Sequence, residues 1–256
     1  MGIIHDIRRA WAAIPRGRQR QCVMCEGRIG AFLPYRGGNC ASAALMRAIG
    51  VVGSDVDNFE CPRCGAHDRE RHLLLYLQES GLLARIPALR ILHFAPEKRM
   101  AQRIVEREPV EYVKCDLHPS AADTRRVDIE AMPFADGSFD MVIANHVLEH
   151  VDDDIRAVAE IRRVLRHDGI AILQTPYSAM LHHTWSDPGL VAEDARLHAY
   201  GQEDHVRLFG RDIVERFAAG GLRPCVETHA GLLARYDASV CGVNEAEPFF
   251  LFRRID

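Results

Sequence analysis

Short apolar runs alternate with helical stripes from the end of the first third of the chain onward. The runs predict four buried strands, within "ALRILHFA", "VEYVKCDLHP", "FDMVIANH" and "IAILQTPY". Helices are predicted between them in "EKRMAQRIVERE" and in "DDDIRAVAEIRRVLRHDG", which has apolar positions at 155, 158, 161, 164 and 165 and Gly169 at its expected C-cap. A helix in "GRDIVERFAAGGL" and a closing strand in "EPFFLFRRI" follow. This alternation indicates an α/β fold with a doubly wound, mostly parallel sheet, which binds ligands at the carboxyl ends of its strands.

A leucine stripe precedes the first of these strands. It predicts a helix in "GAHDRERHLLLYLQESGLL", nearly closed by Gly81, with one face formed by Leu73, Leu74, Leu77 and Leu82. The basic residues of its first turn are expected to be solvated, with a substrate anion as the alternative: Arg69, Arg71 and His72.

A polar, His-rich stretch at about 178–209 interrupts the alternation between the strand "IAILQTPY" and the next helix. Connections of this length are usually lids or binding loops. We therefore expect these residues to form a lid insertion over the ligand site.

Composition narrows the class of protein without defining the function. The 256 residues fit one large α/β domain with a small appendage, and the net charge of −4 gives no global attraction to nucleic acid or anionic membrane. Basic residues gather in "RRAWAAIPRGRQRQ", interpreted as a solvated helix and linker, with a nucleic-acid or membrane patch as the alternative. No apolar run approaches the roughly 18 residues of a membrane span, and a signal peptide is not recognisable, so a cytoplasmic location is expected.

Two C-x-x-C pairs provide the clearest chemical signal. Cys22 with Cys25 and Cys61 with Cys64 supply four thiolates, which is enough for a tetrahedral structural zinc site, and Gly65 follows at a position where tight turns often need a positive φ. Redox pairs are the alternative. The isolated cysteines at 40, 115, 225 and 241 are expected to be small buried hydrophobes.

The chain resembles class I S-adenosylmethionine-dependent methyltransferases. The resemblance is carried by "YVKCDLHP", "VDIEAMPFADGSFDMVIANHVLEHV" and "AEIRRVLRHDGIAILQTPY". It implies a Rossmann-like seven-stranded methyltransferase sheet with a small N-terminal zinc-binding module. A narrower resemblance, to bacterial zinc-ribbon methyltransferases, begins at residue 22. The expected organisation is a basic helix and linker at 1–20, a zinc-binding module at 21–68 and a methyltransferase domain at 69–256.

The resemblance also assigns cofactor contacts. Asp116, with Leu117 beside it, is expected to bind the ribose hydroxyls of S-adenosylmethionine, since a carboxylate can accept two hydrogen bonds. Asp128 and Ile129 are expected at the adenine, and Asn145 at the methionine part.

The loop after the first strand departs from the superfamily pattern. It reads Phe94, Ala95, Pro96 and Glu97, where an acidic residue and two or three glycines are usual. S-adenosylmethionine carries no phosphate, so a phosphate cradle is not required. Glu97 could bind the ammonium group and Pro96 could fix the turn, so we interpret the loop as rebuilt rather than inactive.

These residues are compatible with four functions. The leading prediction is methyl transfer to a small-molecule or sugar hydroxyl. The alternatives are an RNA methyltransferase, which a basic zinc-module face would favour, and a methyltransferase-like binding protein that has lost its cofactor. "HVLEH" at 146–150 also matches an inverted zinc-protease motif, but it directly follows a strand instead of lying within a long helix, so proteolysis is set aside.

"HVLEH" and "EDHVRLFG" supply the candidate catalytic residues His146, Glu149, His150 and His205. Some O-methyltransferase families have a similar cluster that holds a divalent cation at the acceptor hydroxyls. Three interpretations remain open. The cluster braces a turn, His146 or His205 acts as a general base, or the residues bind a second divalent cation that lowers the barrier to deprotonation.

Overall fold

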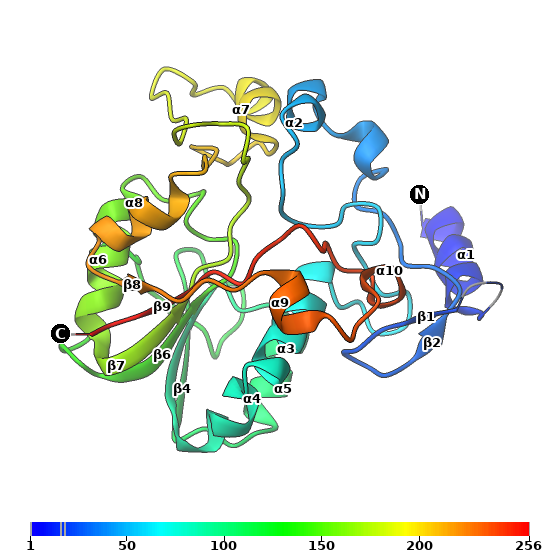
Figure 1. Ribbon diagram of the computed structural model, residues 1–256. Helices are drawn as coiled ribbons and strands as arrows, with labels where there is room; N and C mark the ends of the chain where they lie inside the picture. Colours follow the sequence, from blue (N-terminus) through cyan, green and yellow to red (C-terminus); the bar gives the residue numbers. More distant parts are fainter. Residues whose placement is uncertain (1, 16, 18, 256) are drawn as a thin grey trace.

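The computed structural model describes residues 2–15, 17 and 19–255, with side chains described from residue 6 onward (Figure 1). A seven-stranded sheet lies at the centre, in the order β5-β4-β3-β6-β7-β9-β8. Its strands are β3 (Arg90–Phe94), β4 (Glu111–Asp116), β5 (Arg125–Arg126), β6 (Phe139–Ala144), β7 (Leu165–Ile172), β8 (Arg223–Pro224) and β9 (Leu251–Arg253). The predicted α/β class and doubly wound seven-stranded sheet are confirmed.

Strand direction places several strand ends at one edge of the sheet. β3 pairs in parallel with β4 and β6, β4 with β5, and β6 with β7, whereas β9 runs antiparallel to both of its neighbours. The carboxyl ends of β3, β4 and β6 therefore meet at the same edge. The order of the strands reverses between β3 and β6, which is where parallel sheets bind ligands.

The central strands β3 and β6 bury both of their faces, because helices cover the sheet on both sides. Ile91 and Met141 belong to a core that includes side chains of α3 (Asp68–Glu79), α4 (Leu82–Arg85) and α5 (Lys98–Val105). Their strand neighbours Leu92 and Val142 belong to a second core with α6 (Asp154–Val164) and α8 (Ile213–Ala219). Figure 1 shows the two groups of helices on opposite sides of the strands. The alternation follows from the two-residue period of a strand.

The N-terminal region and the remaining helices surround this core. They are α1 (Gly2–Ala13), β1 (Arg20–Gln21), β2 (Arg28–Ile29), η1 (Asn39–Ala41), α2 (Ala44–Ala48), η2 (Ile86–Ala88), α7 (Glu193–Tyr200), α9 (His229–Leu233) and α10 (Ala238–Cys241). In the part of the chain that is described, no helix combines the length and the apolar character needed to cross a membrane.

The boundary between α6 and β7 differs from the sequence prediction. The helix ends at Val164, and residues Leu165–Ile172 pair with β6 as a strand that carries a bulge. Asp168 adopts φ 60°, and a side chain at Gly169 would approach the Arg166 carbonyl oxygen to 2.8 Å. Gly169 therefore serves a tight bulge and is not a helix C-cap. Pairing with β6 outweighs the helical pattern of the local sequence.

The expectation that the first turn of α3 is solvated is wrong for Arg71 and His72. Their exposed fractions are 0% and 2%. The Arg71 guanidinium donates to carbonyl oxygens of residues 58, 59, 66, 241 and 242, and it stacks on Phe32 at 3.9 Å from the ring centroid. α3 is buried all round because the N-terminal region and the C-terminal segment both pack against it.

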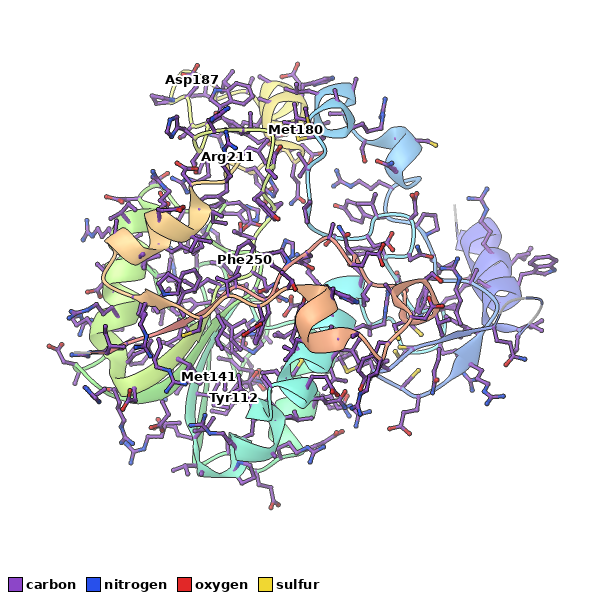
Figure 2. All side chains as sticks on the ribbon, in the orientation of Figure 1. Tyr112, Met141, Met180, Asp187, Arg211 and Phe250 are labelled. Carbon is purple, nitrogen blue, oxygen red and sulfur yellow. The ribbon has the colours of Figure 1, made fainter. Side chains whose placement is uncertain are left out.

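Residues 178–209 leave the sheet and return to it. Tyr177 and Phe209 form a bridge at the base of this segment, and α7 packs against α2 through Met46 and Tyr200. Figure 2 places Met180 and Asp187 of this segment, and Arg211 just after it, at one end of the molecule, away from Met141 and Tyr112 in the sheet. The segment with α2 and the segment with α7, which are far apart in sequence, thus pack together on one side of the molecule.

Candidate functional site

The four predicted cysteines come together. The Sγ atoms of Cys22 and Cys64 lie 3.8 Å apart, those of Cys25 and Cys61 lie 4.0 Å apart, and all four fall within 4.8 Å of one another. Four sulfurs at about 2.3 Å from a tetrahedral zinc would be about 3.8 Å apart. Gly65 adopts φ 76°, as the turn requires. The donor set and its spacing fit a zinc ion.

The cysteine cluster is directly attached to the helix that follows the glycine-free loop. Arg99 Nε donates to the carbonyl oxygen of Cys64 at 2.7 Å, and Arg103 donates to that of Met24 at 2.5 Å. Glu70 Oε1, on α3, accepts from the backbone N–H groups of Arg99 and Met100 at 2.9 and 3.0 Å. The first N–H groups of a helix have no partner within it, and at α5 two of them thus donate to the Glu70 side chain, which lies outside the loop.

The loop after β3 turns sharply without glycine. Ala95 adopts φ 44°, in the left-handed region that glycine normally occupies, and its N–H donates to the Cys115 carbonyl at 2.8 Å. Pro96 and Glu97 follow, and α5 begins at Lys98. Left-handed backbone costs an L-residue roughly 1–2 kcal/mol. The surrounding contacts hold the turn that glycine would otherwise allow, while Phe94 is buried beneath it.

Buried polar atoms without a hydrogen-bond partner gather where this loop meets the end of β6. They belong to Glu97 (Oε2), Asn145 (Oδ1), His93 (Nε2) and Arg69 (Nε). The other Glu97 oxygen accepts from Asn145 Nδ2 at 2.7 Å and lies 3.6 Å from Arg69 Nε. Burial opposes ionisation of Glu97, but His93 and Arg69 hold its pKa below the ordinary value. A buried polar group without a partner is destabilising, so these atoms fit a polar ligand.

The other predicted cofactor residues follow neighbouring strands. Asp116 ends β4, is half-buried and accepts from the His118 amide through Oδ1 at 2.7 Å. Asp128 is exposed just after β5 and accepts from the Glu130 amide at 2.8 Å. Leu117 is exposed, and Ile129 is buried. In both aspartates one oxygen fixes the turn, and these contacts leave the second oxygen available to a ligand.

A cavity of about 1040 Å³ lies beside this edge. Its walls come from residues 35–59 of the cysteine-containing region, from residues 197–205 and from residues 236–245. Arg69 and all four predicted catalytic residues, His146, Glu149, His150 and His205, line it. Small-molecule sites usually measure roughly 300–1,000 Å³, so the cavity could hold a ligand of that class.

His146 lies between two buried carboxylates. Its Nδ1 is 3.3 Å from Glu149 Oε1, and its Nε2 is 3.8 Å from Glu247 Oε1. Burial alone would lower the pKa of His146, but Glu149 and Glu247 raise it above the ordinary value. The two carboxylates therefore stabilise a proton on His146, which makes this residue a weaker candidate for a general base than His205. Residues 146–150 form a turn, which excludes the long helix of the protease motif.

The pKa of His205 is shifted in the opposite direction to that of His146. Its Nδ1 lies 3.1 Å from the Tyr200 carbonyl oxygen, which can only accept, so Nδ1 carries the proton and Nε2 keeps its lone pair. Burial lowers the pKa of His205 and keeps the ring neutral. Its ligand atom lies within 4.8 Å of those of Glu149 and His150, so the three residues could also hold a metal ion.

A group of hydrogen-bonded residues around Glu247 lies next to His146 and was not predicted from the sequence. Glu247 Oε2 lies 2.9 Å from His72 Nδ1, and His72 Nε2 lies 2.9 Å from His229 Nδ1. Gln174, just past β7, donates to the other Glu247 oxygen at 3.2 Å. These residues are far apart in the chain, and only the packing of the C-terminal segment on α3 unites them. Arg69 was noted in the sequence but not assigned to the cofactor.

Comparisons with known proteins give one family match and one relative over part of the chain. A family model described as a methyltransferase domain matches residues 80–173. An uncharacterized 37.1 kDa protein of transposon TN4556 from Streptomyces fradiae is 41% identical over 56 residues, which cover 22% of this chain and only 16% of that protein.

Two solved structures are similar at lower identity. The S-adenosylmethionine-dependent methyltransferase from Mesorhizobium loti shares 15% identity over 69% of this chain and 94% of its own, with a TM-score of 0.45. The 1,6-didemethyltoxoflavin-N1-methyltransferase from Burkholderia thailandensis, solved with S-adenosylhomocysteine, shares 16% over 71% of this chain and 79% of its own, also at 0.45. At these values neither structure bears on the acceptor.

Proposed function

We propose that this chain, whose residues 80–173 match a methyltransferase domain, transfers a methyl group from S-adenosylmethionine to a hydroxyl of a small polar molecule or sugar. The observation that carries the proposal is the group of unpartnered buried polar atoms at the ends of β3 and β6, next to Arg69, which also lines the cavity. Such atoms destabilise the protein alone and gain partners when a polar ligand binds.

The residues at the strand ends match the parts of the cofactor. Asp116, with Leu117 beside it, binds the ribose hydroxyls. Asp128 and Ile129 contact the adenine, and the loop from Phe94 to Glu97 with Asn145 surrounds the methionine part. The unpartnered Glu97 oxygen is an acceptor suited to the ammonium group. Cofactor binding supplies an electrophilic methyl group at the edge of the cavity.

His205 acts as the general base for the acceptor hydroxyl. In the transfer, the carbon–sulfur bond of the methyl donor breaks as the carbon–oxygen bond forms, and the hydroxyl proton passes to Nε2 of His205. Its proton on Nδ1, its burial and its place in the cavity wall support this role. Glu149 Oε1 lies 3.3 Å from His146 Nδ1 at the same wall and favours a proton on that ring, and Thr175 donates to Glu149 Oε2 at 2.8 Å.

A divalent cation is the second candidate for activating the hydroxyl. The ligand atoms of Glu149, His150 and His205 converge within 4.8 Å, and Glu149 Oε1 has no hydrogen-bond partner. In that case the same residues would lower the hydroxyl pKa through the metal. Activity that EDTA abolishes and added Mn²⁺ restores, with the cysteine-bound zinc retained, distinguishes the cation from the base.

The charge of the cysteine-containing region favours a small acceptor over RNA. Residues 21–68 contain four arginines and five acidic residues: Arg28, Arg36, Arg47 and Arg63 against Glu26, Asp55, Asp57, Glu60 and Asp68. RNA-binding modules are usually basic on the contacting face. We further propose that the four cysteines hold one structural zinc.

Calorimetric titration with S-adenosylhomocysteine tests the proposal. Wild-type protein should bind about one ligand per chain. Asp116→Ala should weaken binding by about 10- to 100-fold, because hydrogen bonds to a charged group contribute roughly 1.5–3 kcal/mol. Asp123→Ala, which removes an exposed carboxylate later in the same loop, is the matched control. Wild-type protein that shows no binding at millimolar ligand would contradict the proposal.

A further inference from the structure

The rebuilt loop leaves one charge of the cofactor without a partner. The amino-acid end of S-adenosylmethionine carries an ammonium and a carboxylate close together. Glu97 supplies a negative charge for the first group. A glycine-rich loop can offer backbone N–H groups to a carboxylate, but here the N–H of Ala95 donates to Cys115, and those of Arg99 and Met100 donate to Glu70. With these N–H groups engaged, a side-chain cation near Glu97 is a candidate donor to the carboxylate.

We propose that Arg69 binds the carboxylate of the cofactor's amino-acid end, beside Glu97, which binds the ammonium. This inference rests on the proposed function. Arg69 Nε is buried without a hydrogen-bond partner, and it lies 3.6 Å from Glu97 Oε1, too far for a formed hydrogen bond. The side chain lines the cavity and is 29% exposed, so its outer nitrogens can reach a ligand.

The neighbouring arginines are already engaged. Arg71 donates five hydrogen bonds to backbone carbonyls and is fully buried. Arg99 donates to Cys64 and to Gln102, on the side of the cysteine cluster. Among the arginines of the described chain near this edge, Arg69 therefore combines an unpartnered buried donor with a place in the cavity wall. Its planar fork suits a carboxylate, which a Lys ammonium matches less well.

The position of Arg69 is set by the region that carries the cysteines. α3 begins four residues after Cys64, and the acids on either side of Arg69 are buried and engaged. Asp68 accepts from the Asp55 amide at 2.5 Å, and Glu70 accepts from the His67 amide at 2.7 Å. Both contacts fix the first turn of α3. The cofactor's carboxylate is thus recognised by a helix next to the cysteine cluster and not by the loop after β3.

Two ligands that differ only in the carboxylate test the inference. Calorimetry compares S-adenosylmethionine with decarboxylated S-adenosylmethionine on wild type, Arg69→Gln, Arg69→Lys and the control Arg63→Gln, which changes an exposed arginine of the cysteine-containing region. Wild type and R63Q should prefer the carboxylated ligand by about 10- to 100-fold. In R69Q this preference should fall to within about threefold, while affinity for the decarboxylated ligand is retained, and R69K should be intermediate.

The outcomes distinguish a failure of the Arg69 assignment from a failure of the proposed function. A preference retained in R69Q would overturn the role of Arg69 and leave the proposed function intact. Equal loss of both ligands in R69Q would also overturn it, because a general structural role would then suffice. Failure of wild type to bind either ligand would overturn the proposed function and this inference with it.

Discussion

Arg71→Met tests whether the cysteine-containing region and the sheet domain are held together by one buried guanidinium. The Arg71 side chain reaches carbonyls of Asn58 and Phe59 on one side and of Cys241 and Gly242 on the other. Methionine fills a similar volume but donates no hydrogen bond. The fifth carbonyl that Arg71 contacts, that of Ala66, also accepts from the Cys61 amide and keeps this donor in the variant. The other four carbonyls lose the Arg71 hydrogen bond.

The expected loss follows from those four groups. Each buried carbonyl left without a donor costs about 1 kcal/mol or more, which gives about 4 kcal/mol in total and agrees with the 3–5 kcal/mol typical of breaking a buried charged contact. For a domain of this size, that corresponds to a fall in Tm of about 8–16 °C. Differential scanning calorimetry measures it, with Arg85→Met as an exposed control that should change Tm little. A fall of less than about 3 °C in R71M would show that the Arg71 hydrogen bonds contribute little to stability.

Three further predictions concern the metal, the loop and pH. Freshly purified, reduced protein should contain about one zinc per chain by metal analysis. Cys61→Ser should lose the zinc and lower Tm, because structural zinc contributes roughly 10 kcal/mol to small modules. Zinc retained in C61S would contradict the four-cysteine site. Ala95→Gly should leave Tm unchanged or raise it, because relief of the strain at φ 44° offsets the entropy of glycine. Ala95→Val should lower Tm. A clear fall in the Tm of A95G would show that the turn is not strained. Burial and the neighbouring His72 lower the pKa of His229 in the folded state, so the unfolded state binds this proton first and stability should fall as pH drops below about 6.5. His229→Gln should show a smaller difference in Tm between pH 7.5 and 5.5 than wild type, and an equal difference would argue against that burial effect.

The apolar runs were sufficient to predict β3, β4, β6, β7 and β9, because buried strands are largely apolar and each run is local. The edge strands β5 and β8 are two exposed residues each, so no apolar run marked them. The two C-x-x-C pairs likewise predicted the cysteine cluster, since the ligands are marked by residue type. The end of α6 was not predictable from its pattern. Residues 161–165 fit a helix, and only pairing with Phe139 and Met141 turns residues from Leu165 onward into a strand.

The parts of the site that depend on long-range packing were not visible in the sequence. Arg71 and His72 read as surface residues on a polar first turn, yet the N-terminal and C-terminal segments close over them. Glu247 has no motif around it and reaches His146 only because the segment before β9 crosses α3. The positive φ of Ala95 was equally hidden, because alanine carries no signal for left-handed backbone.

The place of the cofactor would be seen in a crystal structure with S-adenosylhomocysteine bound. We expect the ligand at the carboxyl ends of β3, β4 and β6, with the Asp116 carboxylate about 2.5–3.2 Å from the ribose hydroxyl oxygens and Glu97 at the same distance from the amino nitrogen. Ligand bound elsewhere, or bound at this edge with Asp116 and Glu97 both out of hydrogen-bond reach, would contradict this placement.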